Sequence, residues 1–178
     1  MKNNSVSRRG FLSTTGKAVA AVSCCILCRR STAAESGAGS KFKVSYYAAC
    51  GNYCGGCPSL MKSEKAGKLE KVECLGCFGD KIHPSEANCE LRKCAMEKNV
   101  KVCSLCKDYP CDKTRKFFTK QTVWTTEMKK NLVLIKEKGL DKWLADEKAR
   151  WTCPKCGLKI SFCDKKCPKC GTGLKNLG

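Results

Sequence analysis

Ten cysteines between Cys50 and Cys111 constrain this chain more than any other feature of its sequence. They are spaced C-x3-C-x2-C, then C-x2-C, then C-x4-C, then C-x2-C-x4-C. A C-x2-C turn lets both sulfur atoms face one point, so two such turns can bind a tetrahedral zinc ion, and four thiolates can hold an iron–sulfur cluster. The repeated two-residue spacing favours metal binding over the alternative, a disulfide framework in an exported and oxidised protein.

The cysteines matter for stability because the chain offers little apolar material for a core. Its 178 residues include 18 cysteines but only six Phe, four Tyr and three Trp. Metal ions or disulfides must therefore supply stability that burial does not. The length allows one domain, or one small domain with a minidomain. We predict a small metal-stabilised α+β fold, made of a cysteine-rich domain with short helices, a helical hairpin and a C-terminal zinc ribbon.

The formal charge of +19 raises the question of an acidic partner such as nucleic acid or anionic lipid. Residues 1–34 hold six basic residues and no acidic one, so the rest of the chain carries +13. Each four-thiolate zinc site would lower this further, to roughly +7 for three sites. The remaining charge on a Lys-rich surface indicates solvation rather than a specific basic binding face.

Residues 1–34 have the order of an export signal, with a charged start, an apolar centre and small residues after it. The segment Ser7–Leu12, SRRGFL, resembles the twin-arginine motif. The apolar run Ala18–Cys28 is too short for a membrane-spanning helix, which needs about 20 residues. We predict cleavage after Ala34 or one residue earlier; lipidation at Cys24 and a leader that targets nothing are the alternatives.

This signal predicts recognition by the twin-arginine translocation machinery and a periplasmic or cell-surface location. That route carries proteins already folded, so thiols could bind metal in the reducing cytoplasm before meeting an oxidising exterior. Residues 35–43 are expected to form a flexible linker between the signal and the cysteine-rich domain of residues 44–121. Short helices are predicted in that domain from Pro58 to Lys68, from Glu90 to Lys98 and from about Asp112 to Phe118.

Four motifs in this domain follow one another in a recognisable order: CGNYCGGCP, CLGC, CELRKCA and MEKNVKVCSLCKDYPC. Over about residues 46–120 this order resembles the domain-of-unknown-function 3795 family of small bacterial and archaeal proteins. The resemblance implies metal binding and no assigned activity. Glu86 stands where that family often has a further cysteine, so no ligand set is transferred at this point.

The pairing of thiols is open from spacing alone. Loop closure favours near neighbours, which groups Cys74, Cys77, Cys89 and Cys94 in one zinc site. The second site is then formed by Cys54, Cys57, Cys103 and Cys106. Cys50 and Cys111 are left over, or replace either pair. The single histidine, His83, is expected to be a solvated loop residue rather than a ligand.

The sequence of residues 122–150 predicts two helices separated by a helix-ending glycine. Thr125 or Thr126 can cap the first helix, and Gly139 ends it. Apolar residues fall on one face of each helix and predict core packing rather than a partner-binding stripe. These are Met128, Leu132 and Ile135, widened by Val133 and Leu134, in the first helix, and Leu140, Trp143 and Leu144 in the second.

Residues 151–178 contain the most specific metal pattern of the chain. Two C-P-K-C-G motifs place Cys153 with Cys156 and Cys167 with Cys170, as in a zinc ribbon with a short hairpin at Leu158–Phe162. The glycine after each second cysteine permits a tight turn that aims both sulfurs inward. Four thiolates leave no open position on the ion, so the site is expected to be structural. Cys163 is left without a role.

No set of residues in the sequence indicates catalysis. We therefore predict an exported protein with two or three structural zinc sites, acting by binding an unidentified protein partner and not by turnover. One alternative is an electron-transfer or redox-sensing protein with an iron–sulfur cluster in the central cysteines. Another is a nucleic-acid-binding zinc ribbon protein, which requires a chain that is not exported. Membrane contact is expected only through the signal or a lipid anchor.

Overall fold

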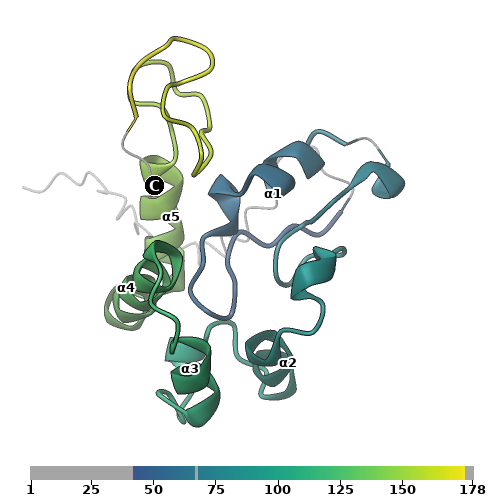
Figure 1. Ribbon diagram of the computed structural model, residues 1–178, viewed down its shortest axis with the longest axis vertical. Helices are drawn as coiled ribbons and strands as arrows, with labels where there is room; N and C mark the ends of the chain where they lie inside the picture. Colours follow the sequence, from purple (N-terminus) through teal and green to yellow (C-terminus); the bar gives the residue numbers. More distant parts are fainter. Residues whose placement is uncertain (1–41, 67, 175–178) are drawn as a thin grey trace, which may run out of the picture. The chain divides into compact units, whose positions relative to one another are not determined.

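The computed structural model describes residues 42–66 and 68–174, and the predicted signal, its cleavage site and Cys24 lie outside them. The described chain is mostly helical, with short helices joined by loops (Figure 1). No described helix has both the length and the apolar character that crossing a membrane would require. The α-helices are α1 (Pro58–Ser63), α2 (Glu90–Glu97), α3 (Asp112–Phe117), α4 (Val123–Lys138) and α5 (Leu140–Arg150); the 3-10 turns are η1 (Cys54–Gly56), η2 (Leu69–Lys71), η3 (Pro84–Glu86) and η4 (Cys103–Leu105).

The predicted β component is reduced to isolated bridges in the described residues, so the α+β description is replaced by a mostly helical one. These antiparallel bridges join Tyr47 to Tyr53, Thr152 to Lys159 and Lys166 to Gly173. The predicted hairpin does not lengthen beyond one bridge because its backbone groups bond elsewhere. The N–H of Phe162 donates to the carbonyl of Gly56 at 3.0 Å, far away in the sequence.

The three short helices of the cysteine-rich region form where the sequence predicts them, with one difference in length. α1 ends at Ser63 and does not continue to Lys68. The Ser63 hydroxyl donates to the carbonyl of Ser59 and accepts the N–H groups of Glu73 and Cys74. These bonds fasten the last turn of α1 to the loop that carries Cys74.

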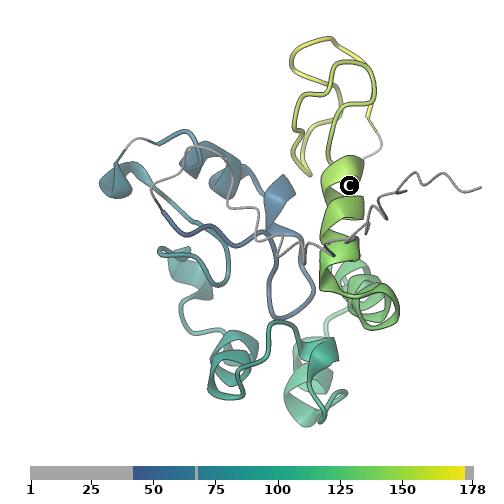
Figure 2. The ribbon, with the colours of Figure 1, turned by 180° about the vertical axis from the view of Figure 1, so that it is seen from behind.

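The helical hairpin begins three residues earlier than predicted, because Thr122 and not Thr125 is the N-cap. The Thr122 hydroxyl accepts the N–H of Thr125 at 3.1 Å, and the Thr125 hydroxyl accepts the N–H of Thr122 at 2.8 Å. This reciprocal pair is a capping box. Gly139, with φ of 82°, ends α4 as predicted, and α5 follows at once. α4 and α5 lie side by side in both views (Figures 1 and 2).

The inner face of this hairpin contributes the largest fully buried side chain of the core, Trp143. Leu132, Ile135 and Trp143 are fully buried. The Trp143 ring meets Tyr53 of the cysteine-rich region edge to face, with ring centroids 6.1 Å apart. Val133 and Leu134 are 53% and 36% exposed, so they do not widen the apolar face of α4 as predicted.

A tight loop at Gly51 joins the cysteine-rich region to α4. Gly51 has φ of 84°, and a Cβ there would lie 2.9 Å from Leu132. The side-chain amide of Asn131 donates to the Gly51 carbonyl at 3.0 Å, and the N–H of Cys103 donates to the Ala49 carbonyl at 2.9 Å. The backbone beside Cys50 is therefore held between α4 and η4.

Candidate metal centres

The C-terminal cysteines lie on two turns of the same shape. In each, the glycine N–H donates at 2.9 Å to the carbonyl of the first cysteine, Gly157 to Cys153 and Gly171 to Cys167. The two glycines have φ of 70° and 71°, in the left-handed region that favours glycine. The C-P-K-C-G sequence thus folds twice into one local structure, and each copy presents two sulfur atoms.

These four sulfur atoms form a compact group. They all lie within 4.8 Å of one another. The Sγ atoms of Cys153 and Cys170 are 3.7 Å apart, and those of Cys156 and Cys167 are 3.5 Å apart. Four sulfurs around a tetrahedral zinc ion, at a Zn–S distance of about 2.3 Å, are separated by about 3.8 Å. The group could therefore hold a metal ion such as zinc.

Hydrogen bonds to one ligand of this group favour its ionised form. The Thr172 hydroxyl lies 3.2 Å from the sulfur of Cys170. Donation from this hydroxyl, and then from the Thr172 N–H, lowers the pKa of the Cys170 thiol to about 6. Since a thiolate and not a thiol binds a metal, this bond prepares Cys170 for coordination near neutral pH.

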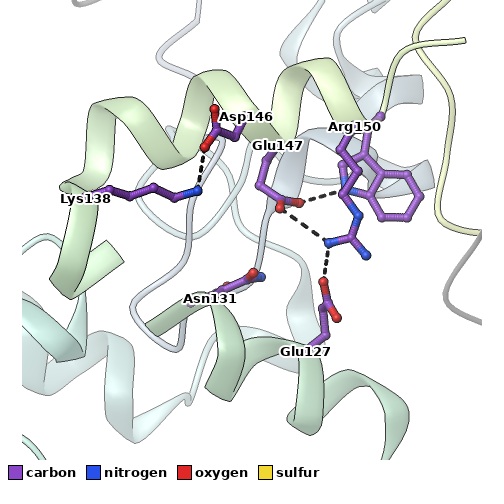
Figure 3. A network of polar contacts seen from close by, with 8 residues as sticks. Glu127, Asn131, Lys138, Asp146, Glu147 and Arg150 are labelled. Atoms are coloured by element: carbon purple, nitrogen blue, oxygen red, sulfur yellow. Dashed lines mark hydrogen bonds and ion pairs between the residues drawn. The ribbon is translucent and has the colours of Figure 1, made fainter. Parts of the chain in front are cut away.

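The C-terminal turns are attached to the hairpin by a polar network at the end of α5. Trp151 is buried, and its indole N–H donates to Glu147 at 2.9 Å. Arg150 bridges Glu147 of α5 and Glu127 of α4 (Figure 3). The rings of Trp151 and Phe162 are in edge-to-face contact at 4.8 Å. Trp151, two residues before the first ligand Cys153, is thus fixed from two sides.

Four of the central cysteines line a second feature, a cavity of about 20 Å³. Cys94 lies in α2, Cys103 is the first residue of η4, Cys106 is the C-cap of η4, and Cys111 is the N-cap of α3. Apolar side chains of Leu91, Ala95 and Val100 also line it. The four cysteines are Cys94, Cys103, Cys106 and Cys111.

The thiols of this cavity are close enough to influence one another. Burial raises the pKa of the Cys103 thiol to about 12, and negative charge on Cys111, Cys94 and Cys106 acts in the same direction. At the exposed edge, the N–H of Thr114 donates to the Cys111 sulfur and lowers the pKa of that thiol. Several thiolates together would therefore need a cation between them.

The remaining central thiols gather beside the Gly51 loop. Burial raises the pKa of Cys50 to about 12, and negative charge on Cys77 and Cys89 contributes to the rise. Burial likewise raises the pKa of Cys54, although the N–H of Cys77 donates to its sulfur. Cys57 packs with Cys50, Cys54 and Cys77 in the same small apolar cluster.

The two sets that loop closure predicts stay a prediction, and the cavity is lined by cysteines from both sets together with Cys111. Cys89 is the N-cap of α2 and Cys94 lies in its last turn. Cys94 lines the same cavity as Cys103, Cys106 and the formerly unassigned Cys111, while burial and the negative charge on Cys89 raise the pKa of both Cys50 and Cys103.

Two other predicted assignments have simple outcomes. His83 is exposed, and its Nδ1 atom pairs with Ser85 at the start of η3, as expected for a loop residue. Cys163 is exposed. Within residues 42–66 and 68–174, every cysteine is a free thiol.

Comparison with known proteins identifies one part of the chain. Residues 46–116 match the model of a family described as "Protein of unknown function (DUF3795)". The matched segment contains all ten central cysteines and ends before the hairpin and the C-terminal group. No curated protein and no solved structure matches the chain.

Proposed function

We propose that this chain, which carries a DUF3795 family domain at residues 46–116, is a metal-binding interaction protein with a structural zinc ion at its C-terminal four-cysteine group. The observation that carries the proposal is the mutual distance of at most 4.8 Å among the four sulfurs. Four thiolates complete the tetrahedron of zinc and leave no position for a substrate. The ion would then stabilise the fold and would not take part in turnover.

The local structure explains why such an ion would be needed. Residues 151–174 contain two single bridges and no helix in the described chain, so regular secondary structure contributes little to their stability. A zinc ion that joins the two turns supplies folding free energy directly. The sequence predicts two or three zinc ions; the described residues bring together one group with the spacing of a zinc site.

The rest of the proposal rests on the sequence. The SRRGFL motif supports export by the twin-arginine route to the periplasm or cell surface. A structural ion supports action through binding of a protein partner, because a closed coordination sphere offers no chemistry to a substrate.

Zinc content of the full-length chain tests the C-terminal site. We expect Cys153→Ala to lose about one zinc ion per chain. Cys163→Ala is the matched control, because Cys163 is an exposed cysteine of the same segment, and its zinc content should equal that of the wild type. Equal zinc content in both variants would refute the assignment.

A reporter that becomes active only after export of a folded protein tests the location. Residues 1–40 fused to it should give activity that is lost when Arg8 and Arg9 are replaced by lysine. Retention of the unchanged fusion in the cytoplasm would refute export and would favour the nucleic-acid-binding alternative.

A further inference from the structure

The cavity lined by Cys94, Cys103, Cys106 and Cys111 is independent of the C-terminal group. Its cysteines come from α2, η4 and the start of α3, and all four lie in the matched family segment. Cys103 is buried, and the other three are partly exposed. Four thiols that line one cavity are a candidate ligand set, since thiolates are strong ligands for zinc and for iron–sulfur clusters.

The spacing of these sulfurs differs from that of the C-terminal group. Within residues 42–66 and 68–174, only the C-terminal cysteines have three or more sulfur atoms within 4.8 Å of one another. The central four line a cavity of about 20 Å³ together with apolar and charged side chains. A single zinc ion draws its four sulfurs to about 3.8 Å from one another. In a cubane cluster each cysteine binds a different iron, so the cysteine sulfurs stand farther apart and surround a volume.

We therefore propose that Cys94, Cys103, Cys106 and Cys111 bind a [4Fe–4S] cluster in the cavity that they line. The spacing C-x8-C-x2-C-x4-C supplies one thiolate for each iron. Leu91, Ala95 and Val100 would form the apolar wall that limits access of water to the cluster.

The surroundings also fit an anionic metal centre. Four thiolates make such a cluster negatively charged, and Lys113 and Lys98 line the cavity, Lys98 also being paired with Asp108 beside the Cys106 sulfur. The Thr114 side chain is buried beneath Cys111, and its hydroxyl lies 3.8 Å from the Cys111 sulfur. Hydrogen bonds to the sulfur ligands are one of the means by which proteins tune iron–sulfur clusters.

The test uses the full-length chain, produced with iron and purified without oxygen. We expect about four iron and four acid-labile sulfide per chain, with visible absorption from thiolate-bound iron. Zinc should be present at about one ion per chain, from the C-terminal group. A colourless protein without iron and sulfide would overturn the cluster.

Paired variants locate the cluster and separate this proposal from the zinc proposal. Cys106→Ala should lose iron and sulfide together and keep zinc. Cys153→Ala should do the reverse, and Cys163→Ala should keep all three. Loss of a second zinc from Cys106→Ala, with no iron in the wild type, would show a zinc site instead. Full iron and sulfide in Cys106→Ala would overturn the ligand set.

A measurement on the unmodified chain covers the case in which Cys106→Ala does not fold. The protein is alkylated before and after removal of iron by a chelator, and the labelled cysteines are identified by mass spectrometry. Cys94, Cys106 and Cys111 are partly exposed, so burial alone does not protect them. We expect them to be labelled only after iron is removed. Labelling while iron and sulfide are retained would overturn the assignment.

Discussion

Two groups of four cysteines in one chain differ in what lies between their sulfur atoms. In the C-terminal group the sulfurs face one another directly, all within 4.8 Å. In the central group they surround a cavity that apolar side chains also line. The ligand atoms are the same, so their number and type do not decide which metal centre fits. The elements that carry the cysteines decide which metal centre fits, because they set how the sulfur atoms are placed.

The C-terminal turns and the Cys74–Cys77 turn of the central region also depend on the rest of the chain to different degrees. The C-terminal turns are local, and nothing lies within 4 Å of where a Cβ of Gly157 or Gly171 would stand. In the central knuckle of Cys74 and Cys77, a Cβ on Gly76 would lie 1.8 Å from the carbonyl oxygen of Ser45. A local turn needs an ion to hold it, whereas a turn packed against distant backbone is held by the fold.

The largest expected effect follows from removing zinc. If the C-terminal turns depend on the ion, a zinc chelator should release residues 151–174 from their folded state. Zinc binding at structural sites contributes a folding free energy on the order of 10 kcal/mol. Hydrogen exchange should then rise strongly at Ile160, whose N–H donates to the Trp151 carbonyl at 2.9 Å. Unchanged protection in that segment would show that the C-terminal turns keep their structure without the ion.

The two kinds of glycine turn can be compared directly. Gly76→Ala should lower the free energy of unfolding by roughly 2–5 kcal/mol, because it combines left-handed backbone strain with overlap on the Ser45 carbonyl. Gly157→Ala should cost only about 1–2 kcal/mol, since its φ of 70° is strained for alanine but its surroundings are open. Urea unfolding of both variants measures the difference. Equal costs would mean that the central turn is as local as the C-terminal one.

The attachment of the C-terminal turns to α5 should have an intermediate effect. Trp151→Phe keeps the ring contact with Phe162 but removes the indole donor from the buried Glu147. We expect a loss of about 1–3 kcal/mol in thermal or urea unfolding. Trp124→Phe is the control, because Trp124 also contacts Phe162 but is 38% exposed, and it should cost less. A smaller loss for Trp151→Phe than for this control would contradict the role of Glu147.

The smallest effect concerns the pH at which zinc is released. The pKa of Cys170 is lowered to about 6, first by the Thr172 hydroxyl. A lowered pKa keeps more of this ligand as thiolate at a given pH, so zinc should be retained to a lower pH than it would be without the hydroxyl. Thr172→Val removes the hydroxyl and should move zinc release to a higher pH. Titration of zinc release with a colorimetric chelator measures the shift, and a shift to lower pH would contradict this account.

The sequence by itself determined the features that depend on neighbouring residues. The start of α3, the end of α4 at Gly139 and the two C-P-K-C-G turns follow from capping residues, proline and glycine within a few positions. The grouping of the four C-terminal cysteines is equally local, because only ten residues separate the two turns.

Only the tertiary structure decided which central cysteines line the same cavity. The cavity depends on the packing of α2 with α3, and on the contacts of Ala49 and Gly51 with η4 and α4. The loss of the predicted hairpin has the same origin, because Phe162 bonds to Gly56 across the fold. Loop length ranks partners by the entropy of closure, which changes slowly with distance along the chain, and the orientation of helices and packed backbone outweighs it.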